Sequence, residues 1–329
     1  MKRVVVEKSG VVVVDKPQGP TSHDVVERVR RRFKPLRVGH VGTLDPFATG
    51  VLVLVFNQAT RVSSILGAGD KLYRGRLVLG VATDTADPTG QVVQRAEVGR
   101  LEPEQVRDVL KSMEGVRYQK PHPFSAAKHK GRPLYYYARR GLKVEKPPRQ
   151  ITIHRLELVK LGEGEIWFEM LCSKGTYVRA VAEEMARALG TVGHLGELRR
   201  VASAPFGEAQ AVELGQLLAW SPQELEEHMI PVDRALEACG LPAVVLDEDR
   251  AWELRQGRIL PSSVLTRTQE GTLPRKGPFR VLDSRGQLVA VLRWLEPGQV
   301  RPGREYETIR VFRPEPGTTN ASASAMGAE

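Results

Sequence analysis

Residues 37–54 read RVGHVGTLDPFATGVLVL, and the organisation of the whole chain is best understood from this stretch. Its three glycines let the backbone turn and let a second chain approach closely. Pro46 fixes one torsion angle and removes a backbone donor. The apolar, β-branched run at residues 51–55 predicts a buried strand. The sequence therefore predicts a stiffened loop that leads directly into the core.

One carboxylate, Asp45, and one imidazole, His40, lie in this loop. A carboxylate held on a stiff loop before a core strand suits a nucleophile or a general base. The alternative is an Asx-turn, in which the Asp45 side chain accepts a hydrogen bond from its own backbone. Local features alone favour neither interpretation.

The composition limits the classes of protein to which this chain can belong. Its 329 residues suffice for one large and one small domain, and the 41% share of hydrophobic residues supplies a core. No apolar run reaches the length of a membrane span, and the N-terminus lacks the apolar segment of a signal peptide. The two cysteines are too far apart for a disulfide framework or a zinc knuckle. We expect a cytoplasmic monomer without membrane contact or metal.

The charge predicts an anionic partner. A net charge of +10 and a pI near 9.7 are most simply explained by nucleic acid binding. Part of this charge is an arginine cluster at residues 28–32, on a helix predicted to begin after Thr21 or Ser22. Such a cluster is either a solvated helix face or a set of phosphate contacts.

Hydrophobic periodicity and turn signals predict the order of the regular elements. A two-strand hairpin is expected around Gly162-Glu163-Gly164, and Ser221 with Glu224 predicts a capping box. The predicted strands are 11–14, 51–55, 71–81, 151–161 and 165–172, and the predicted helices are 22–33, 101–113, 177–189 and 222–228.

The pattern changes after residue 242 to short strands and turns. Strands are expected at 244–246, 277–283, 288–294 and 306–312, which indicates a small β module. Residues 244–313 contain 13 basic against 9 acidic side chains. The tail from residue 314 has no core-forming content and is predicted to be disordered.

Residues 119–146 interleave basic and aromatic side chains. This arrangement is typical of a surface that neutralises phosphate and stacks on bases; the alternative is an ordinary mobile loop. Its members include Lys128, Lys130, Arg132, Tyr135, Arg139 and Arg140.

Arg179 lies near the start of the predicted helix that Gly190 ends. If Thr176 is the N-cap, Arg179 is the third helical residue, and a cation there opposes the helix dipole by about 0.3–1 kcal/mol. Arg179 should therefore have an anionic partner. Asp84 and Asp87 lack the spacing of a calcium loop and are interpreted as turn formers.

The stretch at 37–54 closely resembles the catalytic motif of the TruB family of tRNA pseudouridine synthases, whose pattern is GH-G-LDP-ATG-L. Further family-like segments occur at residues 79–90, 119–146 and 174–179, so that the resemblance covers roughly residues 8–240. At one position, His122 replaces the proline that the family usually has. The matching motif residues are Gly39, His40, Gly42, Leu44, Asp45, Pro46, Ala48, Thr49, Gly50 and Leu52.

The resemblance implies an α/β fold with a central mixed, largely antiparallel sheet flanked by helices. It implies that Asp45 is the nucleophile, that His40 helps to flip the base, and that Tyr73 stacks on it. The family's KGTY-R motif would bring Arg179 onto Asp45, and we expect this cation to keep the pKa of the carboxyl low against the cost of burial.

The resemblance also implies a division of the chain. Residues 1–240 would form the catalytic domain, 119–146 its RNA-clamping thumb, and 244–313 a PUA-like RNA-binding domain, with a disordered tail at 314–329. The RNA contacts it suggests are Lys16, Lys128, Lys130, Arg132, Tyr135, Arg139, Arg140, Lys174 and Tyr177.

The implied activity is the isomerisation of uridine 55 in the tRNA T-arm, by the stand-alone bacterial type of enzyme. The reaction transfers neither electrons nor phosphate, so no cofactor is expected, and no dinucleotide or Walker motif is present in the sequence. One alternative is a guide-RNA-dependent synthase of the archaeal and eukaryotic type. Another is an RNA-binding or tRNA-folding chaperone without catalysis.

Overall fold

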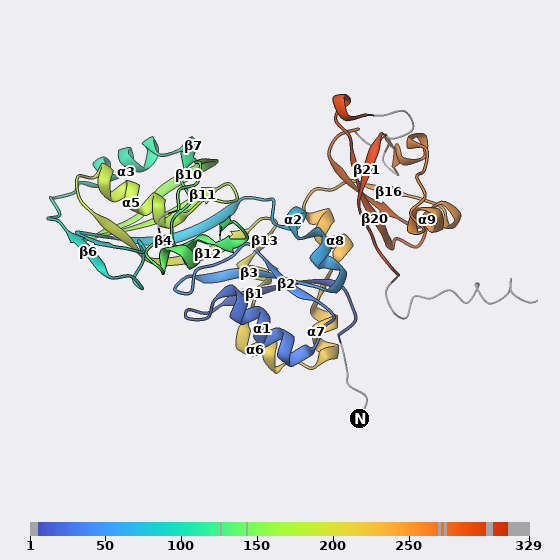
Figure 1. Cartoon of the computed structure of the whole chain (residues 1–329), viewed down its shortest axis with the longest axis horizontal. Helices are drawn as coiled ribbons and strands as arrows, with labels where there is room; N and C mark the ends of the chain where they lie inside the picture. Colours follow the sequence, from blue (N-terminus) through green and yellow to red (C-terminus); the bar gives the residue numbers. More distant parts are fainter. Residues whose placement is uncertain are drawn as a thin grey trace, which may run out of the picture.

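The structure is a computed structural model and describes residues 6–125, 127–142, 144–268, 271–272, 275–300 and 305–314. Figure 1 shows a large lobe, coloured blue to yellow, and a smaller lobe, coloured orange to red. Apart from Pro314, the tail that was predicted to be disordered lies outside the described residues.

A mixed sheet forms the centre of the large lobe. Its main path runs in the order β14-β1-β3-β12-β4-β11-β10-β7. Pairing is antiparallel except between β12 and β3 and between β1 and β14, which confirms the predicted sheet. The strands are β1 (Gly10–Lys16), β3 (Thr49–Phe56), β4 (Lys71–Leu79), β7 (Gly115–Gln119), β10 (Arg149–Gly162), β11 (Glu165–Cys172), β12 (Gly193–Ser203) and β14 (Val212–Glu213), with β2 (Val38–Val41), β13 (Phe206–Gly207) and β15 (Ile230–Pro231) paired beside the path.

Two of the helices begin at the caps that the sequence predicts. Thr21 caps α1, where Asp24 completes a capping box, and Ser221 forms the predicted box with Glu224 at the start of α7. Each box pairs two backbone donors that the helix would otherwise leave free. Outside residues 119–146, the α-helices of the large lobe are α1 (Ser22–Phe33), α2 (Ser63–Leu66), α3 (Pro103–Ser112), α5 (Val178–Ala188), α6 (Leu214–Ala219), α7 (Pro222–His228) and α8 (Val232–Ala238).

Two boundaries differ from the sequence prediction. Tyr177 is the N-cap of α5, so Thr176 is not the cap and Arg179 is the second helical residue. The strand predicted at 71–81 ends at Leu79, because Gly80 adopts a φ of +82° and the chain turns there. The chain then continues into a small hairpin of β5 (Val81–Thr83) and β6 (Val92–Arg95).

Alternation along the central strands supplies two separate cores. On β1, Val12 and Val14 join one core, whereas Val11 and Val13 join the other, as expected when successive side chains point to opposite faces. Residues of α1, α3, α5, α6 and α7 complete the first core. Residues of α2, α8 and the small lobe complete the second. Both faces of β1 and β3 are covered, and this fits the continuously apolar runs at residues 11–14 and 51–56.

The small lobe has a core and a sheet of its own, in the order β16-β19-β20-β21. The four predicted strands are present as β16 (Ala243–Val245), β19 (Pro278–Leu282), β20 (Leu288–Trp294) and β21 (Tyr306–Val311). The sequence prediction missed a helix, α9 (Glu248–Arg255), which Asp247 caps.

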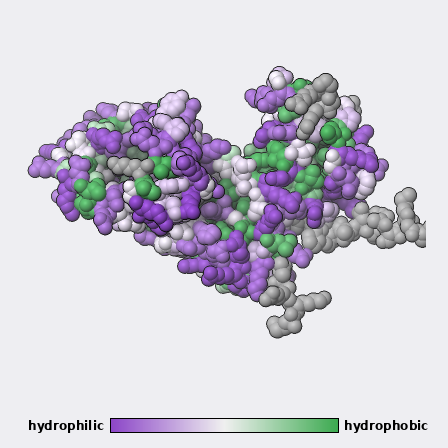
Figure 2. All heavy atoms as spheres, viewed as in Figure 1, coloured by the Kyte–Doolittle hydropathy of each residue, from purple (hydrophilic) through white to green (hydrophobic). Residues whose placement is uncertain are grey.

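The two lobes are joined by side chains as well as by the chain itself. Val291 and Phe312 of the small lobe are buried in the second core of the large lobe. Figure 2 shows a hollow between the lobes and a mainly hydrophilic outer surface on the large lobe. Within the described residues, none of the helices is long and apolar enough to cross a membrane.

Candidate active site

The loop that carries Asp45 connects β2 to β3, and close backbone contact fixes its far end. Gly50 has a φ of +100° and is paired with Arg200 of β12. A Cβ at Gly50 would lie 2.3 Å from the carbonyl oxygen of Arg200, so only glycine fits. The conformation of the loop therefore depends on the approach of β12.

The Arg200 side chain holds both ends of the same loop. It is 1% exposed, and its guanidinium donates to the carbonyls of Gly42 (Nη2, 2.8 Å), Thr43 (Nη1, 3.4 Å) and Val51 (Nε, 2.7 Å). From the other side, Ser22 of α1 accepts a hydrogen bond from the Leu44 amide at 2.8 Å. The residue before Asp45 is thus tied to a helix and the loop ends to a strand.

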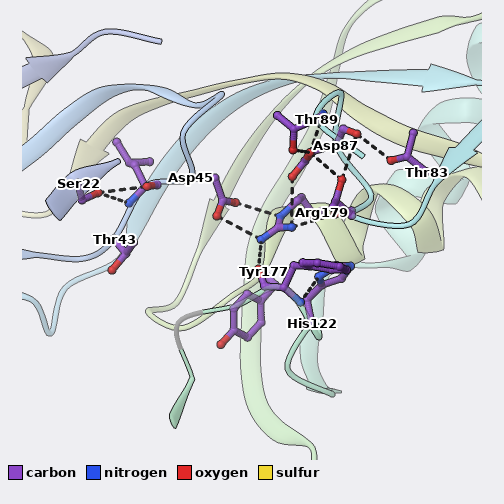
Figure 3. A network of polar contacts seen from close by, with 12 residues as sticks. Ser22, Thr43, Asp45, Thr83, Asp87, Thr89, His122, Tyr177 and Arg179 are labelled. Atoms are coloured by element: carbon purple, nitrogen blue, oxygen red, sulfur yellow. Dashed lines mark hydrogen bonds and ion pairs between the residues drawn. The ribbon is translucent and has the colours of Figure 1, made fainter. Parts of the chain in front are cut away.

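The carboxylate of Asp45 faces Arg179 and not its own backbone, so the Asx-turn interpretation is wrong. Arg179 Nε lies 3.0 Å from Oδ2, and Nη2 donates to Oδ1 at 3.2 Å. The two side chains differ in access: that of Arg179 is 5% exposed, whereas that of Asp45 is 34% exposed. Figure 3 shows Arg179 between Asp45 and the Asp87 segment.

Five oxygen atoms lie around the Arg179 guanidinium. Besides Asp45, Nη2 donates to the Phe124 carbonyl (2.8 Å), and Nη1 donates to the Thr85 carbonyl (2.8 Å) and lies 3.2 Å from Asp87 Oδ2. Three of these contacts are hydrogen bonds, and the contacts of Nε with Asp45 Oδ2 and of Nη1 with Asp87 Oδ2 are ion pairs. The orientation of the guanidinium is therefore fixed from several sides (Figure 3).

Asp87 has a larger role than the turn former that the sequence indicated. Its Oδ1 does accept from the Thr89 amide at 2.9 Å, as in a turn. Its Oδ2, however, is the second anionic partner of Arg179. The match of residues 79–90 to the family pattern was the available signal for this carboxylate. Arg200 has no such signal, because its acceptors are backbone carbonyls.

Burial raises the pKa of Asp45, and the Asp87 charge adds to this rise, whereas the Arg179 cation opposes it. The expectation that Arg179 would keep this pKa low is therefore wrong in net direction, because desolvation of the carboxylate outweighs the attraction.

Tyr73 and His40 lie near the two ends of the loop. Tyr73 is a buried residue of β4, paired with Arg200 in the sheet, and burial raises the pKa of its phenol. His40 is a half-buried residue of β2. Burial, together with the Arg200 charge, lowers the pKa of its imidazole. Both groups are thus neutral at neutral pH.

Lys16, one of the predicted RNA contacts, lies beneath the loop that carries Asp45. Its side chain is completely buried, and Nζ donates to the carbonyls of Pro17, Pro20 and Pro46. Burial lowers the pKa of Lys16 to about 8. Because Pro46 follows Asp45, the ammonium supports the loop from inside.

The predicted thumb forms a two-strand hairpin and a short helix, namely β8 (Lys128–His129), β9 (Arg132–Pro133) and α4 (Leu134–Ala138). Its basic side chains cover aromatic rings: Arg140 lies 3.7 Å and Arg132 4.3 Å from the ring centre of Tyr136. Arg139 lies over Tyr135, which is itself exposed. Lys128, Lys130, Arg132, Arg139 and Arg140 are also exposed.

The remaining predicted RNA contacts lie apart from the thumb. Lys174 is exposed and lines the cavity of about 520 Å³ between the lobes, together with Arg293 of the small lobe. Tyr177 is half-buried beside Arg179, and its backbone is held by the Gln119 side chain.

Comparison with known proteins identifies relatives over most of the chain. A family model described as TruB family pseudouridylate synthase (N terminal domain) matches residues 30–178, and one described as tRNA pseudouridylate synthase B C-terminal domain matches 179–237. A protein of Syntrophotalea carbinolica named tRNA pseudouridine synthase B is 46% identical over 92% of this chain and 98% of its own length. A protein of the same name from Thiobacillus denitrificans is 38% identical over 92% and 97%.

Solved structures support the fold independently. The crystal structure of a Cbf5-Nop10-Gar1 complex contains a chain that superimposes with a TM-score of 0.70 at 24% identity, over 94% of this chain and 86% of that one. The archaeal box H/ACA sRNP Nop10-Cbf5 complex gives a TM-score of 0.66. At this level of identity the likeness concerns the fold.

Proposed function

Since this chain belongs to the TruB family of pseudouridylate synthases, we propose that it isomerises uridine to pseudouridine in tRNA. The names of the relatives support tRNA as the substrate. In finer detail, the proposed target is uridine 55 of the T-arm. We propose that the reaction takes place in the cytoplasm and requires neither a guide RNA nor a cofactor.

The reaction exchanges one bond of the uracil for another. The C1′–N1 bond breaks, the base turns, and a C1′–C5 bond forms, while the hydrogen at C5 leaves as a proton and N1 gains one. No net oxidation occurs. The step needs an ionised nucleophile that adds either to C6 of the base or to C1′ of the ribose.

Asp45 is the proposed nucleophile. The observation that carries the proposal is that its carboxylate is held in a fixed orientation and is still accessible to solvent. Both carboxylate oxygens are oriented by Arg179, yet the side chain is 34% exposed. A buried cation that pairs with a partly exposed carboxylate keeps that carboxylate in one orientation toward the substrate.

Tyr73 and His40 are the proposed partners of the base. The target uridine must leave the helical stack to reach Asp45. We assign Tyr73 to stacking on the flipped uracil and His40 to the space that the uracil vacates. The raised pKa of Tyr73 and the lowered pKa of His40 suit both roles, because neutral rings can stack without a desolvated charge.

The thumb and the small lobe are the proposed RNA grips. The exposed arginines of residues 128–140, which lie over Tyr135 and Tyr136, supply cations on aromatic platforms. Lys174 and Arg293 line the hollow between the lobes, where they could meet phosphates of the same tRNA.

Tritium release from tRNA labelled at uridine C5 tests this function directly, because that hydrogen leaves only if isomerisation occurs. The wild-type chain should release tritium from a tRNA transcript in the absence of any guide RNA. In Asp45→Asn the amide keeps the shape of the side chain but cannot act as the nucleophile. Release should fall below about a hundredth of the wild-type rate, with tRNA affinity within about threefold.

Two results would contradict the proposal. Substantial release by folded Asp45→Asn would exclude Asp45 as the nucleophile. No release by the wild-type chain, despite tight tRNA binding, would favour a non-catalytic RNA-binding protein; release only after addition of a guide RNA would favour the guided type of synthase.

A further inference from the structure

His122 forms part of a turn that faces Arg179, at the position where the sequence departs from the family pattern. The residue is 7% exposed. Its Nδ1 accepts a hydrogen bond from the amide of Phe124 at 3.2 Å, and Figure 3 shows the ring beside Arg179 and Tyr177. The imidazole therefore closes the turn from 122 to 124, as the side chain of an Asx-turn does.

This turn supplies one of the three oxygen atoms that accept a hydrogen bond from Arg179. The carbonyl of Phe124 accepts from Nη2 at 2.8 Å, and the same nitrogen donates to Asp45 Oδ1 at 3.2 Å. If the carbonyl moved away, Nη2 would keep a buried N–H without a partner. The guanidinium would then gain by rotating, which would disturb its fork on Asp45.

We propose that His122 is a positioning residue for the nucleophile: it holds the Phe124 carbonyl against Arg179, which in turn fixes the orientation of the Asp45 carboxylate. This inference rests on the proposed function for its kinetic test, but the chain of contacts stands on geometry alone. It adds a residue to the site that the family motif does not contain.

The charges around His122 favour the protonation state that this role requires. It faces the Arg179 cation on α5 and, more weakly, Asp87 and Asp84 on the segment after β5. Burial and the Arg179 charge lower the pKa of His122 to about 4. At neutral pH the ring is thus uncharged, and Nδ1 is free to accept.

Two substitutions separate the hydrogen bond from the bulk of the ring. His122→Asn keeps an acceptor that can bond the amide two residues ahead. His122→Leu fills similar space without an acceptor, and His122→Ala serves the same purpose if the leucine variant misfolds. Loss of one hydrogen bond should lower kcat on a T-arm stem-loop about tenfold in the Leu or Ala variant, with KM within about twofold. The Asn variant should stay near wild type.

A second measurement does not depend on activity. Carboxyl ¹³C NMR of aspartate-labelled protein should show that the pKa of Asp45 rises in His122→Leu, because Arg179 no longer stabilises the ionised form as strongly. The pKa should be unchanged in His122→Asn. A purely structural role for His122 would alter stability without this selective shift.

The outcomes distinguish the two proposals. Wild-type kcat and an unchanged Asp45 pKa in folded His122→Leu would overturn the positioning role, as would equal impairment of the Asn and Leu variants. If wild-type protein releases no tritium, the proposed function fails, and the NMR titration alone decides whether His122 positions Asp45.

Discussion

Arg179 lies between two carboxylates, and its geometry decides which substitutions the site can tolerate. A buried cation is costly unless it is paired, and the planar fork of Arg179 makes three hydrogen bonds and two further ion-pair contacts here. Lysine carries the same charge as a compact ammonium with three donors. It cannot bridge Asp45, Asp87 and the two carbonyls at once.

Arg179→Lys should therefore reduce kcat on a T-arm stem-loop by about two orders of magnitude, since the nucleophile loses its fixed orientation. Stability should fall by about 1–3 kcal/mol, because backbone acceptors lose their donors. The matched control is Arg74→Lys on β4, whose ion pair with Glu169 is solvent-exposed on the Arg side; it should change neither quantity measurably. Stem-loop kinetics and urea unfolding of both variants provide the comparison, and equal behaviour of the two would refute the special role of Arg179.

The raised pKa of Asp45 predicts a specific pH dependence. The nucleophile must be ionised, and burial raises its pKa above the ordinary 3.8. Activity should therefore be lost as the pH falls through a midpoint that lies above 3.8. In Asp87→Asn, removal of a neighbouring negative charge should move this midpoint to lower pH. The profile of kcat/KM on the stem-loop reports the free enzyme, and circular dichroism at each pH controls for unfolding. A midpoint that shifts upward in Asp87→Asn would contradict this account.

Among the elements, the contact between β3 and β12 has the greatest influence on the site. It brings Gly50 against Arg200 and thereby sets the exit of the loop that carries Asp45. Gly50→Ala should cost about 3 kcal/mol or more of unfolding free energy, because the Cβ would overlap a backbone oxygen that cannot move without the strand.

Gly190→Ala is a matched control for the backbone strain alone. Its φ is +79°, similar to that of Gly50, but a Cβ there would meet nothing within 4 Å. It should cost only about 1 kcal/mol. Urea unfolding of the two variants separates backbone strain from steric overlap. Similar losses of unfolding free energy in both variants would mean that β3 and β12 do not approach closely at Gly50.

The elements also show what the sequence could predict. The core of the strand Thr49–Phe56 was predictable from the run at residues 51–55, which is buried on both faces and apolar throughout. The capping box of α1 was only partly predicted: the cap was foreseen, whereas Asp24 was not singled out. The pairing of Arg179 with Asp45, which are 134 residues apart, came from the family motif and not from periodicity.

Other contacts had no local signal. Arg200 donates to carbonyls 149 to 158 residues away, and carbonyls are present at every residue. The burial of Lys16 was not predicted, because it depends on turns formed around three prolines, of which Pro46 is distant in the sequence. The helix α9 was missed because it presents no marked apolar stripe and leaves Trp252 exposed.

For the whole molecule, Arg280 at the junction of the lobes is the decisive residue. It lies on β19 of the small lobe, and its guanidinium donates to Asp233 Oδ1 (2.7 Å) and Glu237 Oε1 (3.1 Å) of α8 and to the Leu241 carbonyl (2.9 Å). Its side chain is 6% exposed. The small lobe is thus held in one orientation next to a shared apolar core.

This junction lies apart from the proposed chemistry, because His40, Asp45, Tyr73 and Arg179 all belong to the large lobe. Arg280→Met removes the buried fork and leaves the Asp233 carboxylate unpaired, which should loosen the small lobe. The turnover of a minimal T-arm stem-loop should stay within about twofold. Affinity for full-length tRNA should fall about tenfold. In a plot of log binding constant against log salt concentration, the slope should become shallower by roughly one unit for each phosphate that the protein no longer neutralises.

Arg234→Met is the charge-matched control, since Arg234 is exposed on α8 and pairs only with Glu237 of the same helix among the described residues. This variant should leave the affinity for full-length tRNA and the slope of its salt dependence within about twofold of wild type, because the lobes stay joined. Single-turnover kinetics with both substrates at two salt concentrations make the comparison. If Arg280→Met slows even a saturating stem-loop while Arg234→Met does not, the small lobe helps to build the active site and the division of labour between the lobes is wrong. If full-length tRNA binds both variants as it binds the wild type, the orientation of the small lobe has no part in gripping RNA.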